Sequence, residues 1–448
     1  MVSINKDEIA QWTERHGRPP SILFMVDSTN GFGHFNTAAE VCSRMRDMGA
    51  DVCIASSTAK ASEGIFDMKG VKQHSLPPVL SRRDPEKGKQ YITPKGTLYK
   101  EDTEYQALRA DKLKAITEEF TPDIVVFDIY PFAGSNYRID DMNALKSSFA
   151  DTSADPSFIC LGRDIMHSHN PQRVLGALED FDHILVHSDG VMNKLQDCQE
   201  DWHQITTPIE YMGNVIRDLP VRDDTINDAE RPLMVFAGGG YNPSDEALFK
   251  TAIEARSHSA QFRDNPWKIV VSEKCPEPIF QELVERARDI DPSGTKIIVT
   301  KPYNSADFTN DIANCAGAII GGSYNVTTEL LYYNMPFVTV PRFSDEQIMR
   351  ADLLERHGLA RKFPQEEFKR DQSLTESEQQ TIATRLAETL DSTRTLQSDP
   401  TLELDYNGAD RMAQRMVELA CKQRESNILG RTNTQTGAAR GYGTHGSR

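Results

Sequence analysis

The side chains best suited to bind a phosphorylated ligand lie between residues 316 and 358. A short apolar segment ends at a glycine pair that includes Gly322, and glycine permits a tight turn there. A helix is predicted to begin directly after this turn, at Ser323, Tyr324 and Asn325. Free N–H groups and the helix dipole favour a phosphate at such a position. The segment therefore predicts a nucleotide-binding turn, with an ordinary βαβ unit as the alternative.

Carboxylates follow this turn at useful spacings. Glu329 lies four residues past Asn325, which is about 6 Å along a helix. That distance is similar to the step from a pyrophosphate to a ribose, whose two hydroxyls can share one carboxylate. Glu346 and Gln347 come after the next predicted strand, and ligands of open α/β sheets bind beyond the carboxyl ends of strands.

A second glycine turn contains a histidine. Gly31, Gly33 and His34 follow the first apolar strand, but the third glycine of a dinucleotide fingerprint is replaced by Asn36 and no acid ends the next strand. An imidazole at this place can take a proton from an attacking hydroxyl. The alternative is a histidine that caps or packs the helix start.

Three consecutive glycines, Gly238, Gly239 and Gly240, form a third turn after a buried strand. Three glycines are costly for a simple turn because each loses much backbone freedom. They indicate close approach of a ligand, or of the other half of the protein, to the backbone.

Charged residues end two further predicted strands. Asp128 follows one strand, and Arg163 and Asp164 follow the next. These side chains are expected at the carboxyl edge of the first sheet, where they can bind an acceptor or assist the base; a solvated or helix-capping role is the alternative. His167 and His169 resemble a metal pair, but no acid or cysteine accompanies them locally, so we predict no metal and no cofactor.

Composition limits the possible classes. The chain has 448 residues and a formal net charge of −17, which disfavours nucleic acid as a partner. Seven scattered cysteines without a Cys-x-x-Cys motif favour a reduced cytoplasm. No signal peptide and no apolar run of about 20 residues are apparent.

The elements that position these residues repeat in two halves. Each half begins with an apolar strand, a glycine turn and a helix. The polar, acidic stretch 217–231 is interpreted as a linker, and 81–104 as loop. Predicted strands cover 21–26, 51–55, 123–128, 157–161, 183–186, 233–237, 268–271 and 296–299. The sequence therefore predicts an α/β fold with two Rossmann-like domains facing across a cleft.

Taken together, these motifs resemble those of GT-B-fold glycosyltransferases of the family 28 type. That family includes the N-acetylglucosaminyl transferase of peptidoglycan synthesis. The matching pieces run in order from about residue 20 to 390. They include the Gly-His turn at 31–34, the segment 122–128, the motif 211–217, the glycines 238–240 and the turn at 321–325 with Glu329.

The resemblance implies roles. Residues 1–216 would form the acceptor-side domain, 217–400 the nucleotide-sugar domain and 401–424 a helix that crosses back, with 425–448 a disordered tail. Glu329 would hold the ribose and Ser323 with its neighbours the phosphates. Glu346 and Gln347 would bind the sugar hydroxyls, and His34 in the turn that meets the acceptor would be the base or contact the leaving phosphate.

The function expected from this resemblance is inverting, metal-independent transfer from a nucleoside-diphosphate sugar, with UDP favoured, to an unidentified acceptor. Two alternatives stay open: a nucleotide-sugar hydrolase or epimerase on the same fold, and a non-catalytic nucleotide-sugar-binding protein. The sequence does not define the oligomeric state.

Overall fold

The structure is a computed structural model of the chain. It describes residues 5–26, 33–57, 68, 70–84, 88–132, 137–150, 154–238, 241–301, 305–342, 344–368, 375–397 and 399–439. None of the described helices is long and apolar enough to cross a membrane.

The first half of the chain builds a seven-stranded, wholly parallel sheet. Its order is β3-β2-β1-β6-β7-β8-β9. The strands are β1 (Ser21–Met25), β2 (Asp51–Ser56), β3 (Lys72–Ser75), β6 (Ile124–Asp128), β7 (Ser157–Gly162), β8 (His183–Val186) and β9 (Ile209–Tyr211).

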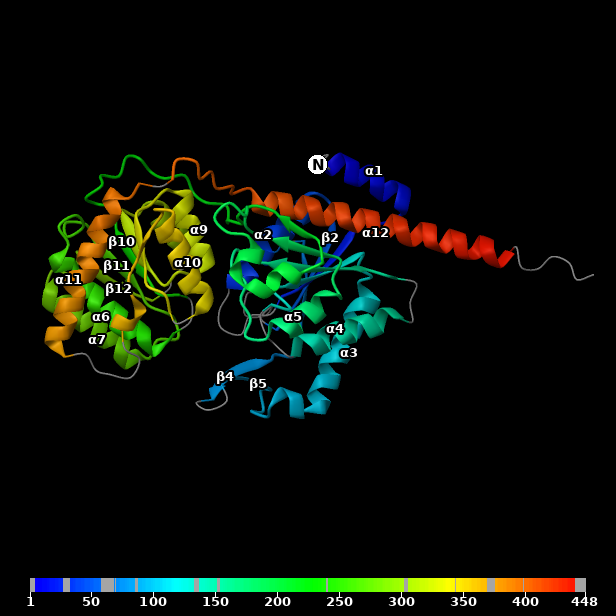
Figure 1. The fold of residues 1–448 in the computed structure, drawn as a ribbon, viewed down its shortest axis with the longest axis horizontal. Coiled ribbons are helices and arrows are strands. Elements are labelled where there is room, and N and C mark those ends of the chain that lie inside the picture. The colour runs from blue at the N-terminus through cyan, green and yellow to red at the C-terminus, as the bar shows by residue number, and fades with distance from the viewer. Residues whose placement is uncertain are drawn as a thin grey trace, which may run out of the picture.

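The second half repeats the plan with a six-stranded parallel sheet. Its order is β12-β11-β10-β13-β14-β15. The strands are β10 (Leu233–Phe236), β11 (Trp267–Val270), β12 (Ile297–Thr300), β13 (Gly317–Ile320), β14 (Phe337–Thr339) and β15 (Arg361–Lys362). The predicted pair of Rossmann-like sheets is confirmed, and Figure 1 shows the two halves side by side.

Helices cover both faces of each sheet, which explains why the central strands are apolar, whereas the edge strands β3 and β15 are polar. In β1, Ile22 and Phe24 face one core while Leu23 and Met25 face the other. The first sheet packs α1 (Lys6–His16), α2 (Gly33–Asp47) and α12 (Gly408–Ala439) on one face. Its other face packs α3 (Thr103–Glu119), α4 (Tyr137–Ala150) and α5 (Pro171–Leu178).

The second sheet is covered in the same way. One face packs α6 (Pro243–His258), α7 (Glu277–Ile290) and α11 (Glu376–Ser392). The other face packs α8 (Ser305–Ala313), α9 (Tyr324–Tyr332) and α10 (Asp345–Arg356).

The stretch 81–104 differs from the predicted loop. It contains an antiparallel hairpin, β4 (Leu80–Asp84) with β5 (Gly88–Ile92), and a short 3-10 helix, η2 (Tyr99–Glu101). Rings of Tyr91 and Tyr99 both pack on Tyr137 of α4. Aromatic contacts over such a sequence distance leave no local hydrophobic period, so the hairpin was not predicted.

The chain passes between the two halves twice. Residues 212–232 form the first crossing without helix or strand, and 399–407 form the second. The crossings touch each other, because the Asn214 N–H donates to Asp405 O at 2.7 Å and the Gly408 N–H donates to Asn214 O at 3.1 Å. The domain limits at 216/217 and 400/401 stay predictions.

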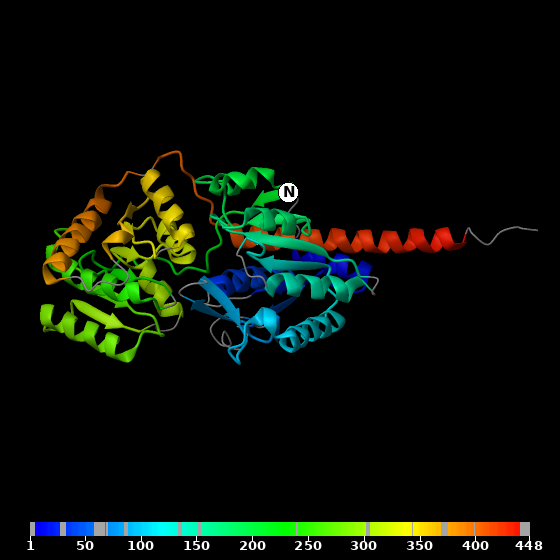
Figure 2. The ribbon, with the colours of Figure 1, turned by 60° about the horizontal axis from the view of Figure 1, so that its bottom comes forward.

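Helix α12 is longer than predicted. It packs along α2 and the first sheet, beside α1, in both ribbon views (Figures 1 and 2). We predicted a disordered tail from residue 425, but the helix continues to Ala439, and 440–448 lie outside the described residues. Trp12 donates to Glu425 at 3.2 Å and Asn427 to Asp155 O at 3.0 Å. These polar contacts support the extra turns, and composition alone does not reveal them.

Candidate active site

The order of each sheet fixes where a ligand can bind. Strand order reverses between β1 and β6 in the first sheet, and between β10 and β13 in the second. In open α/β sheets the crevice for a ligand lies outside the carboxyl ends of strands at such a switch point. His34 and Asp128 stand at the first switch point and Gly238 and Gly322 at the second, so the predicted site residues converge from both sheets.

His34 is held by a carboxylate and a guanidinium. Its Nδ1 lies 2.6 Å from Asp128 Oδ2 and 2.8 Å from Arg163 Nη2. Burial opposes the charge of Asp128, but the charges of His34 and Arg163 outweigh it and lower the pKa of that carboxyl. Arg163 can only donate, so it competes with Asp128 for Nδ1, and the Asp128 contact is the shorter of the two. With the proton on Nδ1 and donated to Asp128, the lone pair lies on Nε2, which is the tautomer that a general base requires.

The first-sheet residues Arg163 and Asp164 join a charge network that reaches α10. Arg350, which is 2% exposed, contacts both oxygens of Asp164 at 2.6 and 2.7 Å and Glu346 at 2.7 Å. It also donates to Gly322 O at 2.8 Å. Although burial opposes its charge, Arg350 and Arg163 lower the pKa of Glu346 to about 2. The network joins the carboxyl edges of the two sheets.

Helix α9 presents its N-terminus to the same region. Gly322 has a φ of 76°, a conformation that favours glycine. Ser323 is the N-cap and makes no side-chain cap bond, so it leaves the first helical N–H groups to other acceptors. Asn325 donates from Nδ2 to Gly33 O at 3.2 Å. The glycine turns of the two halves thus meet directly.

The remaining glycines of the turns serve packing in part. A Cβ on Gly238 would lie 2.6 Å from Arg342 Nη1, and one on Gly321 would lie 2.1 Å from Ala237 O. The atom that an added Cβ on Gly321 would meet belongs to Ala237, at the end of the adjacent strand. Gly321 is therefore needed for packing within the protein and not for access of a ligand. Gly31, Gly239 and Gly240 lie outside the described residues.

Arg342 organises the loop after β14. It pairs with Asp245 at 2.6 Å, and its backbone N–H donates to Gln347 Oε1 at 2.8 Å. The side-chain oxygen of Gln347 therefore already accepts a hydrogen bond from the backbone of the same loop.

Glu329 is buried and paired. It is 1% exposed, and its Oε1 lies 2.6 Å from Arg217 Nη2 of the first crossing. Burial raises the pKa of Glu329, with Arg217 opposing. Its Oε2 has no hydrogen-bond partner among the described residues. The cavity beside it measures about 10 Å³, so a ribose can reach Glu329 only after Arg217 moves.

Tyr324 connects the two halves through its hydroxyl. The hydroxyl donates to His187 O at 2.7 Å and accepts from the Val215 N–H at 3.1 Å, while the ring is 4% exposed. The side chain of Tyr324 therefore packs against protein, and its predicted part in nucleotide binding at the start of α9 stays a prediction.

We expect Tyr324→Phe to lower the free energy of unfolding by about 1–3 kcal/mol, because both backbone partners lose a buried hydrogen bond. Urea unfolding followed by tryptophan fluorescence measures the change. Tyr332→Phe on the same helix, whose ring is 46% exposed, is the matched control. Equal stabilities of the two variants would contradict the bridging role.

Two contributors to this region were not predicted. Arg350 had no local motif that marked it, and Arg217 ended the motif 211–217 without a role assigned to it. The only available signal for Arg350 was its position one helical turn after Glu346, a spacing at which side chains of a helix meet.

Searches against known protein families and against curated proteins find no match. Solved structures do match. MurG of Acinetobacter baumannii aligns over 89% of this chain and 100% of its own, with 12% identity and a TM-score of 0.53. The fold is GT-B.

Two other GT-B neighbours agree. A Listeria monocytogenes protein described as a UDP-N-acetylglucosamine 2-epimerase covers 91% of this chain and 96% of its own, with 10% identity and a TM-score of 0.57. Phytolacca americana UGT2, complexed with UDP-2fluoro-glucose and pterostilbene, covers 90% and 94%, with 12% identity and a TM-score of 0.51. The predicted resemblance to GT-B glycosyltransferases is confirmed at the level of fold.

Proposed function

We propose that this GT-B protein is an inverting glycosyltransferase that moves a sugar from a UDP-sugar to an acceptor hydroxyl or amine, without a metal ion in the transfer step. The observation that carries the proposal is the meeting of the two glycine turns. It brings His34, with Asp128 behind it, opposite the N-terminus of α9. A base and an anion-binding helix end then face one another across the cleft.

In this reaction the acceptor attacks the anomeric carbon while Nε2 of His34 takes its proton. The bond from that carbon to the diphosphate breaks, and the electron pair leaves with the diphosphate. The N–H groups at the start of α9 stabilise the departing charge. Solved structures of this fold that contain UDP or a UDP-sugar support uridine diphosphate as the nucleotide of the donor.

The space between the two domains is too small in this structure to hold a nucleotide sugar. The cavity lined by His34, Arg163 and Glu346 measures about 220 Å³, which is below the roughly 300–1,000 Å³ of typical ligand pockets. Together with the small cavity at Glu329, this indicates that the domains part to admit a nucleotide.

Thermal-shift measurements with UDP-, GDP- and TDP-sugars test the donor, and UDP-sugars should give the largest stabilisation. No stabilisation by any nucleotide sugar would contradict the proposal. Because the Listeria neighbour is described as an epimerase, the protein should also be incubated with donor alone. Complete conversion to free sugar or to an epimer would indicate the hydrolase or epimerase alternative.

We expect Glu329→Gln to weaken UDP binding by about 10- to 100-fold, because a charged hydrogen bond to ribose is lost. Isothermal titration calorimetry with UDP measures this change.

Arg217→Gln is the matched control, because it breaks the same ion pair but keeps the carboxylate. It should retain UDP affinity. If both variants lose affinity equally, the ion pair and not the Glu329 carboxylate matters for binding.

A further inference from the structure

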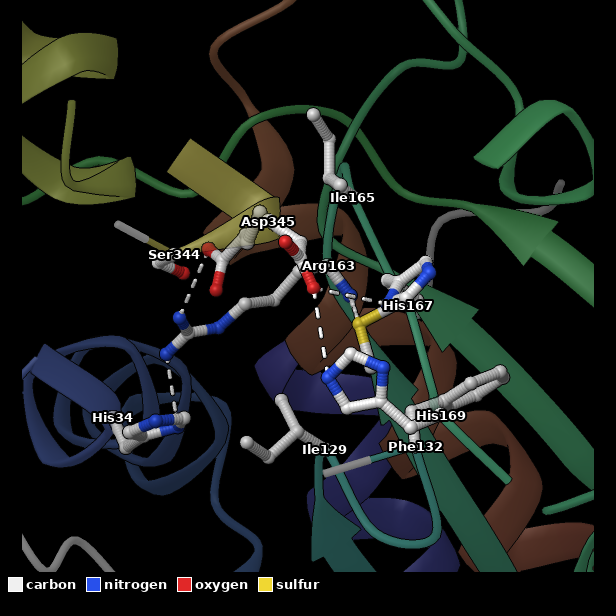
Figure 3. A pocket seen from close by; sticks show the side chains of 11 residues that line it. His34, Ile129, Phe132, Arg163, Ile165, His167, His169, Ser344 and Asp345 are labelled. Carbon is white, nitrogen blue, oxygen red and sulfur yellow. Dashed lines mark hydrogen bonds and ion pairs between the residues drawn. The ribbon is translucent and has the colours of Figure 1, made fainter. Parts of the chain in front are cut away.

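A cluster of two histidines and one aspartate lies at the mouth of the cleft. His167 and His169 belong to the loop between β7 and α5, and Asp345 is the first residue of α10. One ligand atom from each lies within 4.8 Å of the others. In Figure 3, dashed lines run from the Asp345 carboxylate to the imidazoles of both His167 and His169. The two histidines have no acid near them in the sequence, but α10 of the second half places Asp345 beside them.

The distances from Asp345 to the two histidines fit a shared metal ion better than direct hydrogen bonds. Asp345 Oδ2 lies 3.6 Å from His167 Nδ1 and 3.6 Å from His169 Nε2. These separations are too long for N–H···O hydrogen bonds. A tetrahedral ion with bonds of about 2.0–2.2 Å has ligand atoms about 3.3–3.6 Å apart, so both measured distances match its edges.

The elements hold these ligands in place. His167 and His169 lie close together in this loop, with ring centroids 5.3 Å apart in an edge-to-face arrangement. Ser168 between them is fixed by two bonds with Gln199, whose Oε1 accepts at 3.0 Å and whose Nε2 donates at 3.1 Å.

The donor set selects the class of ion. Two imidazoles and one carboxylate suit Zn²⁺ and its transition-metal neighbours. Mg²⁺ and Ca²⁺ prefer oxygen ligands alone. All seven cysteines are buried, so thiolates do not offer a competing surface site.

We propose that His167, His169 and Asp345 bind one divalent transition-metal ion, with Zn²⁺ as the natural probe, and that the ion links the loop after β7 to α10. The fourth position would hold water or another small donor. The ion would hold the two sheets in the closed arrangement, and this role does not rest on the proposed glycosyl transfer.

The test uses the full chain without a histidine tag. Calorimetry should show one Zn²⁺ bound per chain, and Co²⁺ should give the intense visible absorption of a tetrahedral site. His167→Ala and Asp345→Asn should each weaken Zn²⁺ binding by at least about 10-fold, since even outer partners of a metal site contribute that much. His203→Ala, an exposed histidine elsewhere, should bind like the wild type, and Mg²⁺ should not displace Zn²⁺.

A second measurement addresses the link between the halves. Zn²⁺ should raise the melting temperature of the wild type and leave that of Asp345→Asn unchanged. Absence of Zn²⁺ binding to the full chain would overturn the site. If His167→Ala loses the ion but Asp345→Asn keeps it with full affinity, the ion does not join the two halves and the proposal fails. Circular dichroism of these surface variants checks that each is folded.

Discussion

Replacing His34 with alanine should lower the rate of sugar transfer by about 100- to 10,000-fold, the usual contribution of a positioned general base. UDP affinity should stay unchanged, because the imidazole acts on the acceptor side of the cleft. Steady-state rates with the best donor, together with UDP calorimetry, separate the two effects. An unchanged rate in His34→Ala would remove His34 from the mechanism.

Asp128→Asn sharpens this test. The asparagine keeps the shape of the side chain but no longer fixes Nδ1–H by charge, so the imidazole loses its preferred tautomer. We expect a large fall in rate with unchanged UDP affinity, as for His34→Ala. The double variant should be little worse than either single one, because the two residues act as a unit. His203→Ala should keep full activity.

Replacing Arg350 with methionine should lower the free energy of unfolding by about 3 kcal/mol, because the partly buried carboxylates of Asp164 and Glu346 would lose the cation that balances their charges. This value is at the lower end for a broken buried pair, since Glu346 is 32% exposed at its side chain. Urea unfolding, followed separately by fluorescence and circular dichroism, measures the loss and reveals whether the halves unfold together.

Arg356→Met on the same helix is the matched control, because Arg356 is exposed. It should change stability by less than about 0.5 kcal/mol. Adding Asp164→Asn and Glu346→Gln to Arg350→Met should restore part of the lost stability, since the unpaired charges are then gone. If this triple variant is less stable than Arg350→Met alone, the charge explanation is wrong.

The sequence predicted most of the fold for one physical reason. Strands buried on both faces, such as β1 and β10, are continuous apolar runs, and each ends at a glycine turn that marks the next helix. Those turns also predicted the place of the site, because the carboxyl ends of parallel strands share one edge of a sheet.

What could not be predicted depends on contacts between distant parts of the chain. Arg217 of the first crossing reaches Glu329 of α9, and Asp345 of α10 reaches His169 in the first half. No local period or motif encodes such pairs, so Glu329 was predicted as a free ribose ligand and the histidines as a pair without an acid. The hairpin β4–β5 was missed for the same reason.

The contact between Asn214 and Asp405 has a consequence for motion. Because the two chain crossings are hydrogen-bonded to each other at this place, we expect the cleft to open by rotation about this contact. Gly408 lies at this axis, where an added Cβ would meet Gly213 O at 2.3 Å.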